Sequence, residues 1–394
     1  CYYCACNKII TKNRDHAVPY LANLHKEIKL QGELFDSNRV VEQLHWGGGT
    51  PTFISHDQMR ELMAITREAF NLAEDDKGEF SIEIDPREAT AETIQVLREI
   101  GFNRISLGVQ DFNPTVQKAV NRIQTEAETF AVIDAARESG FRSVSLDLIY
   151  GLPHQTPESF SETLDKVIAV NPDRLSVFNY AHLPERFKVQ RQMNEQDMPT
   201  PAVKLAILQQ STQQLTEAGY VYIGMDHFAK PDDELAIAQR ENKLYRNFQG
   251  YSTHSECDLV GLGVTSIGSV GDSYSQNRRT LEEYNTSLAN NELPVFRGFT
   301  LNADDKVRRV VITKLICHFS LNIMEIEKEL EINFAEYFAE VLPQLDQFSQ
   351  DGLLTYNAEK IEVLPAGHLL IRNICMAFDK YMQEKQGKNF SKVI

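Results

Sequence analysis

Short apolar segments alternate with longer amphipathic segments between about residue 40 and residue 230. The short segments are rich in Val, Ile, Leu and Tyr, and several are apolar almost throughout. This composition is typical of strands that are buried on both faces of a parallel sheet. The predicted strands are 40–46, 80–85, 104–109, 143–150, 174–180 and 220–225.

The segments between these strands have helical periodicity and recognisable ends. Ser55, Thr90 and Thr156 are predicted N-caps, and glycines such as Gly101 and Gly140 mark helix ends. The predicted helices are 55–70, 90–102, 125–141, 156–170 and 201–220. Repeated βα units predict a parallel sheet with right-handed crossovers, so we expect an α/β fold, a partial (β/α)6 TIM-like barrel.

The pattern changes in the last part of the chain. Residues 227–300 are predicted to form loops and short strands, and the segments 304–319, 323–338 and 340–354 to be helical. A short hairpin followed by a helix is expected within 352–374. We therefore predict a barrel with a connecting segment over residues 1–300 and a smaller, mostly helical cap domain over residues 301–394.

Composition and charge narrow the range of partners. The chain has 394 residues, 42% of them hydrophobic, and a formal net charge of −16, so nucleic acid is a poor expected partner. No apolar run approaches the ~18 residues of a membrane span. Six cysteines in a chain of this size do not suggest a disulfide framework, and we expect a cytoplasmic protein. Cys257, Cys317 and Cys375 are expected to be small buried side chains.

Polar residues and glycines follow each predicted strand. In a parallel barrel this edge carries the chemistry. Gly47, Gly48 and Gly49 would let a ligand approach the backbone, although a tight turn explains them equally well. The other residues at or near strand ends are Glu83, Asp85, Gln110, Asp111, Asp147, Asn179, Tyr180, His182, Asp226 and His227.

Glu83 and Asp147 lie inside predicted apolar strands, where an unpaired charge is costly. They could form structural ion pairs with Arg104 or Arg122. Alternatively, they face a ligand and bind ribose hydroxyls or an amino group.

The chain starts with "CYYCACNKII", in which Cys1, Cys4 and Cys6 are clustered. A zinc site would need further ligands, and His16 and His25 follow at spacings of no common zinc finger. An iron–sulfur cluster needs three or four thiolates. One further cysteine, four residues before Cys1, would complete the pattern C-x3-C-x2-C.

Together these features resemble the radical S-adenosylmethionine (SAM) superfamily, and within it the oxygen-independent coproporphyrinogen III oxidases (coproporphyrinogen dehydrogenases). The resemblance extends over essentially the whole chain. It rests on "CYYCACNK", "HWGGGTPT", "FSIEIDPRE", "ISLGVQDFN", "AVNRIQ", "SLDLIYGLPHQT", "NYAHLP", "YIGMDHFAKP", "NFQGYST" and "RNICMAFDKY".

Haem chaperones on the same fold are the alternative. They share the "GGGTP" loop, but they usually have an aromatic residue in place of Cys6 and a serine in place of Asp111. Cys6, Asp111 and "RNICMAFDKY" therefore favour the oxidase.

The resemblance implies that Cys1 and Cys4 are two of three ligands of a [4Fe–4S] cluster, and that the first ligand lies four residues before Cys1. Cys6 matches a family cysteine that is not a ligand. The resemblance also implies a SAM site and a second SAM molecule, to which Phe248 and Gln249 would contribute. The positions that match SAM contacts are Tyr3, Gly48, Gly49, Thr50, Glu83, Gln110, Arg122 and Asp147, with Ala181 and Ile267 at the nucleoside.

The implied reaction is the anaerobic oxidative decarboxylation of two propionates of coproporphyrinogen III to vinyl groups, which gives protoporphyrinogen IX in haem biosynthesis. In the family a 5′-deoxyadenosyl radical abstracts the hydrogen. The implied partners are a cluster reductant such as flavodoxin or ferredoxin and an electron acceptor, and we expect a monomer. Lys8, Lys12 and Arg14 are candidates for the substrate carboxylates, or else part of a solvated loop.

Overall fold

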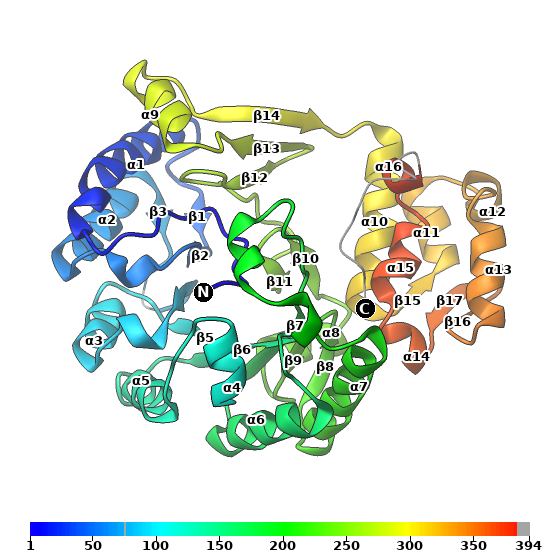
Figure 1. The fold of residues 1–394 in the computed structure, drawn as a ribbon. Coiled ribbons are helices and arrows are strands. Elements are labelled where there is room, and N and C mark those ends of the chain that lie inside the picture. The colour runs from blue at the N-terminus through cyan, green and yellow to red at the C-terminus, as the bar shows by residue number, and fades with distance from the viewer. Residues whose placement is uncertain (75, 384–394) are drawn as a thin grey trace. The chain divides into compact units, whose positions relative to one another are not determined.

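The structure, a computed structural model, describes residues 1–74 and 76–383 (Figure 1). The end of the predicted cap domain, 384–394, lies outside the described residues. Contacts divide the chain into two units. Unit 1 comprises Cys1–Tyr180, Pro184–Ile207 and Cys257–Thr300, and unit 2 comprises Ala181–Leu183, Leu208–Glu256 and Leu301–Ile394.

A parallel sheet forms the centre of unit 1. Its strands lie in the order β2, β4, β5, β6, β7. Their bounds are β2 Gln43–Trp46, β4 Glu79–Ile84, β5 Arg104–Gln110, β6 Ser143–Tyr150 and β7 Arg174–Asn179. The predicted strand 40–46 is interrupted at Glu42, and its first part, β1 (Val40–Val41), pairs with β3 (Asn71–Leu72) instead.

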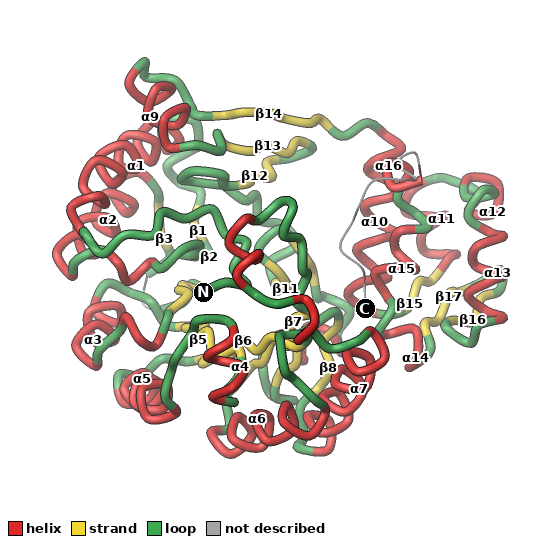
Figure 2. The backbone as a smooth tube through the Cα atoms, in the orientation of Figure 1, coloured by secondary structure: helices red, strands yellow, loops and turns green. Residues whose placement is uncertain are grey.

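Side chains along these strands alternate between two surroundings. On β5, Leu107 and Val109 are buried, whereas Ser106 and Gln110 are only half-buried. Figures 1 and 2 show helices on the outer side of these strands. The prediction that the strands are buried on both faces was therefore wrong: one face packs under helices and the other is more polar and partly open, because successive side chains point to opposite faces.

The five predicted helices between the strands begin where they were predicted to begin, whereas the short helix Pro114–Ala119 was not predicted. Ser55, Thr90 and Thr156 each form a capping box with the third residue of the helix. Gly101 and Gly140 follow helix ends with positive φ, a conformation that glycine adopts without strain. The helices are α2 His56–Ala69, α3 Ala91–Glu99, α4 Pro114–Ala119, α5 Glu126–Glu138, α6 Pro157–Val170 and α7 Pro201–Glu217, the last of which crosses the division between the units.

Unit 1 also contains two further helices that were not predicted, and short strands within 227–300, as predicted. Helix α1 (Ala17–Gly32) packs Leu21 and Ile28 against Leu62 of α2. An antiparallel sheet follows residue 257, together with helix α9. These elements are β12 Ile267–Val270, β13 Ser273–Asn277, α9 Leu281–Ala289 and β14 Val295–Thr300.

Unit 2 is mainly helical. The sixth predicted strand is present as β8 (Val221–Gly224), but β9 (His227–Ala229) pairs with it antiparallel. The predicted helix 323–338 is two helices, because Glu331 adopts a left-handed conformation. The other elements of unit 2 are α8 Glu234–Arg240, β10 Tyr245–Asn247, β11 Gly250–Ser252, α10 Ala303–His318, β15 Ser320–Asn322, α11 Ile323–Leu330, α12 Phe334–Tyr337, α13 Leu342–Gln350, β16 Leu354–Tyr356, β17 Lys360–Val363, α14 Pro365–His368, α15 Ile371–Met376 and α16 Lys380–Gln383.

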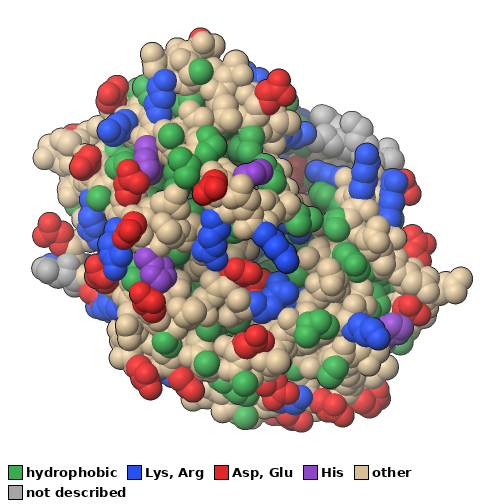
Figure 3. All heavy atoms as spheres, turned by 60° about the vertical axis from the view of Figure 1, so that its left-hand side comes forward, with side chains coloured by type: hydrophobic (Ala, Val, Ile, Leu, Met, Phe, Trp, Pro, Cys, Tyr) green, Lys and Arg blue, Asp and Glu red, His purple; other side chains and the backbone are tan. Residues whose placement is uncertain are grey.

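The predicted α/β class, with a central parallel sheet and a helical C-terminal part, agrees with the structure. Cys317 and Cys375 are buried as expected, but Cys257 is exposed, so its prediction was wrong. In the described part of the chain, no helix is both long and apolar enough to cross a membrane. Figure 3 shows basic side chains interspersed with acidic ones on one face of the molecule.

Candidate functional site

The loop after β2 leaves open space beside its backbone. Gly48 and Gly49 have φ values of 77° and 63°, and a Cβ added to either would meet no described atom within 4 Å. A Cβ on Gly47 would instead collide with His45 and Glu83. The three glycines thus let the chain pass close to Glu83 and then expose two residues of backbone to a ligand.

Glu83 is held in a fixed position on β4. Its Oε1 lies 3.4 Å from Nε2 of His45, and its Oε2 accepts a hydrogen bond of 3.1 Å from the Gly48 N–H. Nδ1 of His45 lies 2.8 Å from the Ser81 hydroxyl, which orients the ring. Burial opposes ionisation of Glu83, but the contacts with His45 and Gly48 outweigh it, so the pKa of Glu83 is lowered.

Asp147 lies on β6, in register with Gly108 of β5 and Ser176 of β7. Its Oδ2 accepts a hydrogen bond of 2.9 Å from the Ser106 hydroxyl. Burial, and to a smaller extent the charge of Glu83, raises the pKa of Asp147 to about 6, against the hydrogen bonds from Ser106 and Ser176.

One alternative was that Glu83 and Asp147 form ion pairs with Arg104 or Arg122, and the structure shows that this is wrong for both arginines. Arg104 pairs with Glu79 at 3.9 Å, and Arg122 pairs with Asp85 at 3.0 Å. Glu83 and Asp147 therefore belong to the more polar face of the sheet, where Ser106 and Ser81 also lie.

Gln110 ends β5 in a strained backbone. It has a φ of 70°, and the register between β5 and β6 shifts between Gly108 and Gln110. Its Oε1 is buried and has no hydrogen-bond partner among the described residues. A buried amide oxygen without a partner is costly, so a ligand donor is the simplest partner for it. A Cβ on Gly108 would meet the side chains of Gln110 and Arg122, so glycine is needed there.

Asp85 joins two arginines beside the first cysteine. Arg87 donates to it at 2.6 and 2.9 Å, and Arg122 at 3.0 Å. Arg122 also donates to the Gly108 carbonyl at 2.5 Å. Both guanidinium groups reach Sγ of Cys1, Arg87 at 3.7 Å and Arg122 at 3.6 Å.

Cys4 is held by contacts with Cys6 and Lys8. The hydrogen bond from Cys6 outweighs the cost of burial and, with a further contribution from Lys8, lowers the pKa of Cys4 to about 5, whereas the pKa of Cys6 is raised. Within residues 1–74 and 76–383, no group of three or more Cys, His, Asp or Glu side chains could hold a metal ion. Cys1 and Cys4 are partly exposed.

The remaining predicted residues lie on loops or at strand ends. The Tyr3 carbonyl accepts a hydrogen bond of 3.1 Å from Gln190, and burial raises the pKa of the Tyr3 phenol to about 12. Thr50 precedes the 3₁₀ turn Pro51–Phe53, and Ile267 begins β12. In unit 2, Phe248 and Gln249 form the turn between β10 and β11, and Ala181 belongs to the short segment Ala181–Leu183.

Of the three basic residues predicted as candidates for the substrate carboxylates, Lys12 and Arg14 are exposed. Arg14 stands 3.6 Å from Glu88 and over the ring of Phe53. Lys8 is half-buried beside Cys4.

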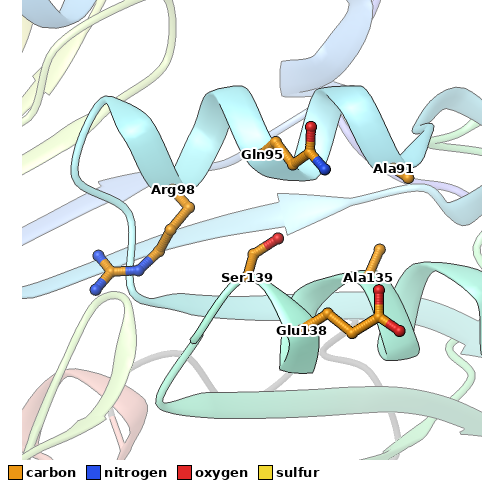
Figure 4. A pocket seen from close by; sticks show the side chains of 6 residues that line it. All are labelled: Ala91, Gln95, Arg98, Ala135, Glu138 and Ser139. Carbon is orange, nitrogen blue, oxygen red and sulfur yellow. The ribbon is translucent and has the colours of Figure 1, made fainter.

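A groove of about 320 Å³ lies elsewhere, between α3 and α5 (Figure 4). Its lining includes Arg98, which is already paired with Asp76 at 2.7 Å. None of the predicted site residues lines it, so the groove is separate from the candidate site. The lining residues are Ala91, Gln95, Arg98, Ala135, Glu138 and Ser139.

His45, Ser106 and Arg87 are site residues for which the sequence predicted no role. His45 lies two positions before the predicted Gly47, and Ser106 lies four positions before the predicted Gln110 in the same alternation of β5, so alternation along the strands could have revealed both. Arg87 follows Asp85 by two residues within a turn, and no pattern indicated it. Asp111 serves the fold: it is buried and accepts hydrogen bonds from Gln155 and Thr163 at 2.6 and 2.7 Å.

Comparisons with known proteins identify the family of this chain. A family model described as "Radical SAM superfamily" matches residues 1–167, and one described as "HemN C-terminal domain" matches residues 301–370. The chain is 57% identical to an oxygen-independent coproporphyrinogen III oxidase of Pseudomonas aeruginosa over 394 residues, which is all of this chain and 86% of that protein. It is 51% identical to the Escherichia coli protein of the same name over 395 residues, again all of this chain and 86% of that protein.

A solved structure matches the fold of the chain over nearly its whole length. The coproporphyrinogen III oxidase of Escherichia coli, described as a radical SAM enzyme, matches with a TM-score of 0.94 and 51% identity over 97% of this chain and 87% of that chain. The chain therefore belongs to the oxygen-independent coproporphyrinogen III oxidase family of the radical SAM superfamily.

Proposed function

We propose that the chain converts coproporphyrinogen III to protoporphyrinogen IX without oxygen, by oxidative decarboxylation of two propionate side chains. The supporting observation is 57% identity over all 394 residues to a protein named for this activity. The proposed catalytic part is residues 1–300, with residues 301–394 as a cap. The proposed setting is the cytoplasm, with a monomeric protein.

Cys1 and Cys4 fit as two of the three thiolate ligands of a [4Fe–4S] cluster, the third being the cysteine expected four residues before Cys1. Cys1 and Cys4 supply two thiols, of which Cys4 has a pKa of about 5. Thiolates are the usual ligands of such clusters. Arg87 and Arg122 bring positive charge to Cys1, which suits a negatively charged sulfur.

The residues present also fit SAM. The open space at Gly48 and Gly49, the buried Oε1 of Gln110 without a partner, and the two carboxylates offer complementary groups for an ammonium, a carboxylate and ribose hydroxyls. When bound, the cluster and SAM supply one-electron chemistry that protein side chains lack.

In this proposal each side chain has a role in binding. Glu83, held by His45 and Gly48, accepts from the ammonium of the amino acid part, and Arg122 binds its carboxylate. Asp147 and Gln110 accept from hydroxyl or amine donors. Tyr3, Thr50, Ala181 and Ile267 complete the contacts, and Phe248 and Gln249 contact a second SAM.

The proposed partners follow from the balance of the reaction. Loss of carbon dioxide and a hydrogen from each propionate leaves electrons that an acceptor must remove, and a reductant such as flavodoxin or ferredoxin must supply the cluster. Lys8, Lys12 and Arg14 are proposed contacts for the substrate carboxylates.

The test uses full-length protein with its cluster loaded anaerobically. Incubated with coproporphyrinogen III, SAM and dithionite, it should form protoporphyrinogen IX, measured as protoporphyrin by fluorescence after oxidation and chromatography. Omission of SAM is the control. Stable, stoichiometric haem binding without decarboxylation would contradict the proposal and favour a haem chaperone.

A further inference from the structure

Arg87 occupies a defined place beside Cys1. It belongs to the turn that follows β4, where the Asp85 side chain caps the backbone N–H of Arg87 at 3.2 Å. The same carboxylate accepts from Nε and Nη2 of Arg87, which fixes the plane of the guanidinium group. Nη2 of Arg87 also donates a hydrogen bond to Sγ of Cys1, with an N···S distance of 3.7 Å.

Arg122 approaches the same sulfur from a different element. It lies after α4, is almost completely buried, and divides its donors among Asp85, the Gly108 carbonyl and Cys1. Two guanidinium groups would repel each other at this distance. Asp85 lies between them and offsets one of the two charges, so the group of three keeps a net charge of +1 next to the sulfur.

We propose that Arg87 is a positioning residue that raises the reduction potential of the cluster by donating a hydrogen bond to the Cys1 sulfur. This role rests on the proposed function, because it requires Cys1 to be a cluster ligand. Adding an electron to a cluster increases the negative charge on its sulfurs. Nearby N–H donors and positive charge stabilise that reduced form, and hydrogen bonds to the sulfurs are among the factors that set such potentials.

Arg87 is better suited to this task than Arg122. Arg122 has a second role in the proposed function, the binding of the SAM carboxylate. Within the described chain the hydrogen bonds of Arg87 go to Asp85 and Cys1, so no second role competes with its contact to the sulfur.

The test compares midpoint potentials of the one-electron reduction of the cluster, measured by anaerobic titration and electron paramagnetic resonance, without SAM. Arg87→Met removes the charge and the donors but keeps an apolar stem. We expect its cluster to be about tenfold harder to reduce, which is ~59 mV for one electron. Arg87→Lys keeps the charge and should show a smaller shift.

Arg60→Met is the matched control. Arg60 also makes a two-point pair with a carboxylate, that of Glu99 at 3.1 and 3.0 Å, but in the outer layer of helices. An unchanged midpoint in iron-replete Arg87→Met would overturn the proposal, as would an equal shift in Arg60→Met.

Iron and sulfide analysis separates the possible failures. If Arg87→Met loses its cluster, the midpoint potential of Arg87→Lys alone tests the proposal. Loss of the cluster from both variants would show that Arg87 has a structural role and would overturn a role in setting the potential. An unsubstituted full-length protein that binds no iron and sulfide would instead overturn the proposed function itself.

Discussion

Replacing Glu27 by alanine should loosen the loop that leads to Ile267. Glu27 lies on α1 and is fully buried. Within the described chain its carboxylate accepts hydrogen bonds from the Gly263 N–H at 2.7 Å, the Asn277 side chain at 2.6 Å and the Tyr284 hydroxyl at 2.6 Å. One side chain thus joins α1 to the loop before β12, to β13 and to α9.

The expected increase in local opening follows from the three buried donors that lose their acceptor. A buried donor that loses its acceptor costs about 1–3 kcal/mol, so three such donors cost on the order of 3 kcal/mol even at the low end. Every 1.4 kcal/mol is about tenfold in an equilibrium constant, so local opening of the loop should become roughly 100-fold more favourable. Glu27→Gln keeps the shape and loses one acceptor position, so it should show a smaller effect of roughly tenfold.

Hydrogen–deuterium exchange of the Gly263 amide measures this opening directly, because that amide is itself one of the donors. Glu33→Ala is the matched control, since Glu33 is an exposed carboxylate at the end of the same helix. If Gly263 in a folded Glu27→Ala protein keeps its protection within about threefold, the reasoning is refuted.

Three further predictions concern the candidate SAM site. Gly48→Ala should fold, because the added Cβ meets no described atom. Its affinity for SAM, measured by calorimetry, should fall at least tenfold, because the methyl group enters the proposed SAM space and alanine at this positive φ costs about 1 kcal/mol of backbone strain. Unchanged affinity would place SAM elsewhere. Asp147 has a pKa of about 6 and loses its charge as the pH falls through that value, so SAM affinity should weaken below about pH 6. Asp147→Asn should abolish this pH dependence between pH 5 and 8, and because the variant keeps Glu83 and His45, the comparison isolates the contribution of Asp147. Asp85→Ala frees Arg122 from its partner and should raise the KM for SAM about tenfold with little change in iron content; an unchanged KM would show that Asp85 does not position Arg122.

Much of the site could be predicted because parallel strands place their carboxyl ends together. The rule that chemistry follows the strand ends selected Gly48, Glu83, Gln110 and Asp147, and the structure finds them on or after β2, β4, β5 and β6. The caps of α2, α3 and α6 were predictable for a similar reason: a capping box is a local feature that depends on residues three apart.

Features that depend on long-range contacts could not be predicted in this way. Helix α1 was missed although it carries Glu27, whose partners lie more than 230 residues further along the chain. The antiparallel pairing of β8 with β9 was missed because an apolar run does not show the direction of its neighbour. One of the two alternatives for Glu83 and Asp147, an ion pair with Arg104 or Arg122, was wrong for the same reason, since charge alone does not distinguish Asp85 from Glu83 or Asp147 as the partner of Arg122.

The position of Asp85 explains why these carboxylates differ. Asp85 comes after the last residue of β4, so its side chain can cap a turn and meet two guanidinium groups. Those contacts overcome the cost of burial, and the pKa of Asp85 is lowered. Asp147, inside β6, has hydroxyl partners and no arginine within hydrogen-bonding distance in the described chain, and its pKa is raised. The arginines therefore neutralise the carboxylate beside the cysteines and leave Asp147 able to accept a hydrogen bond from a ligand.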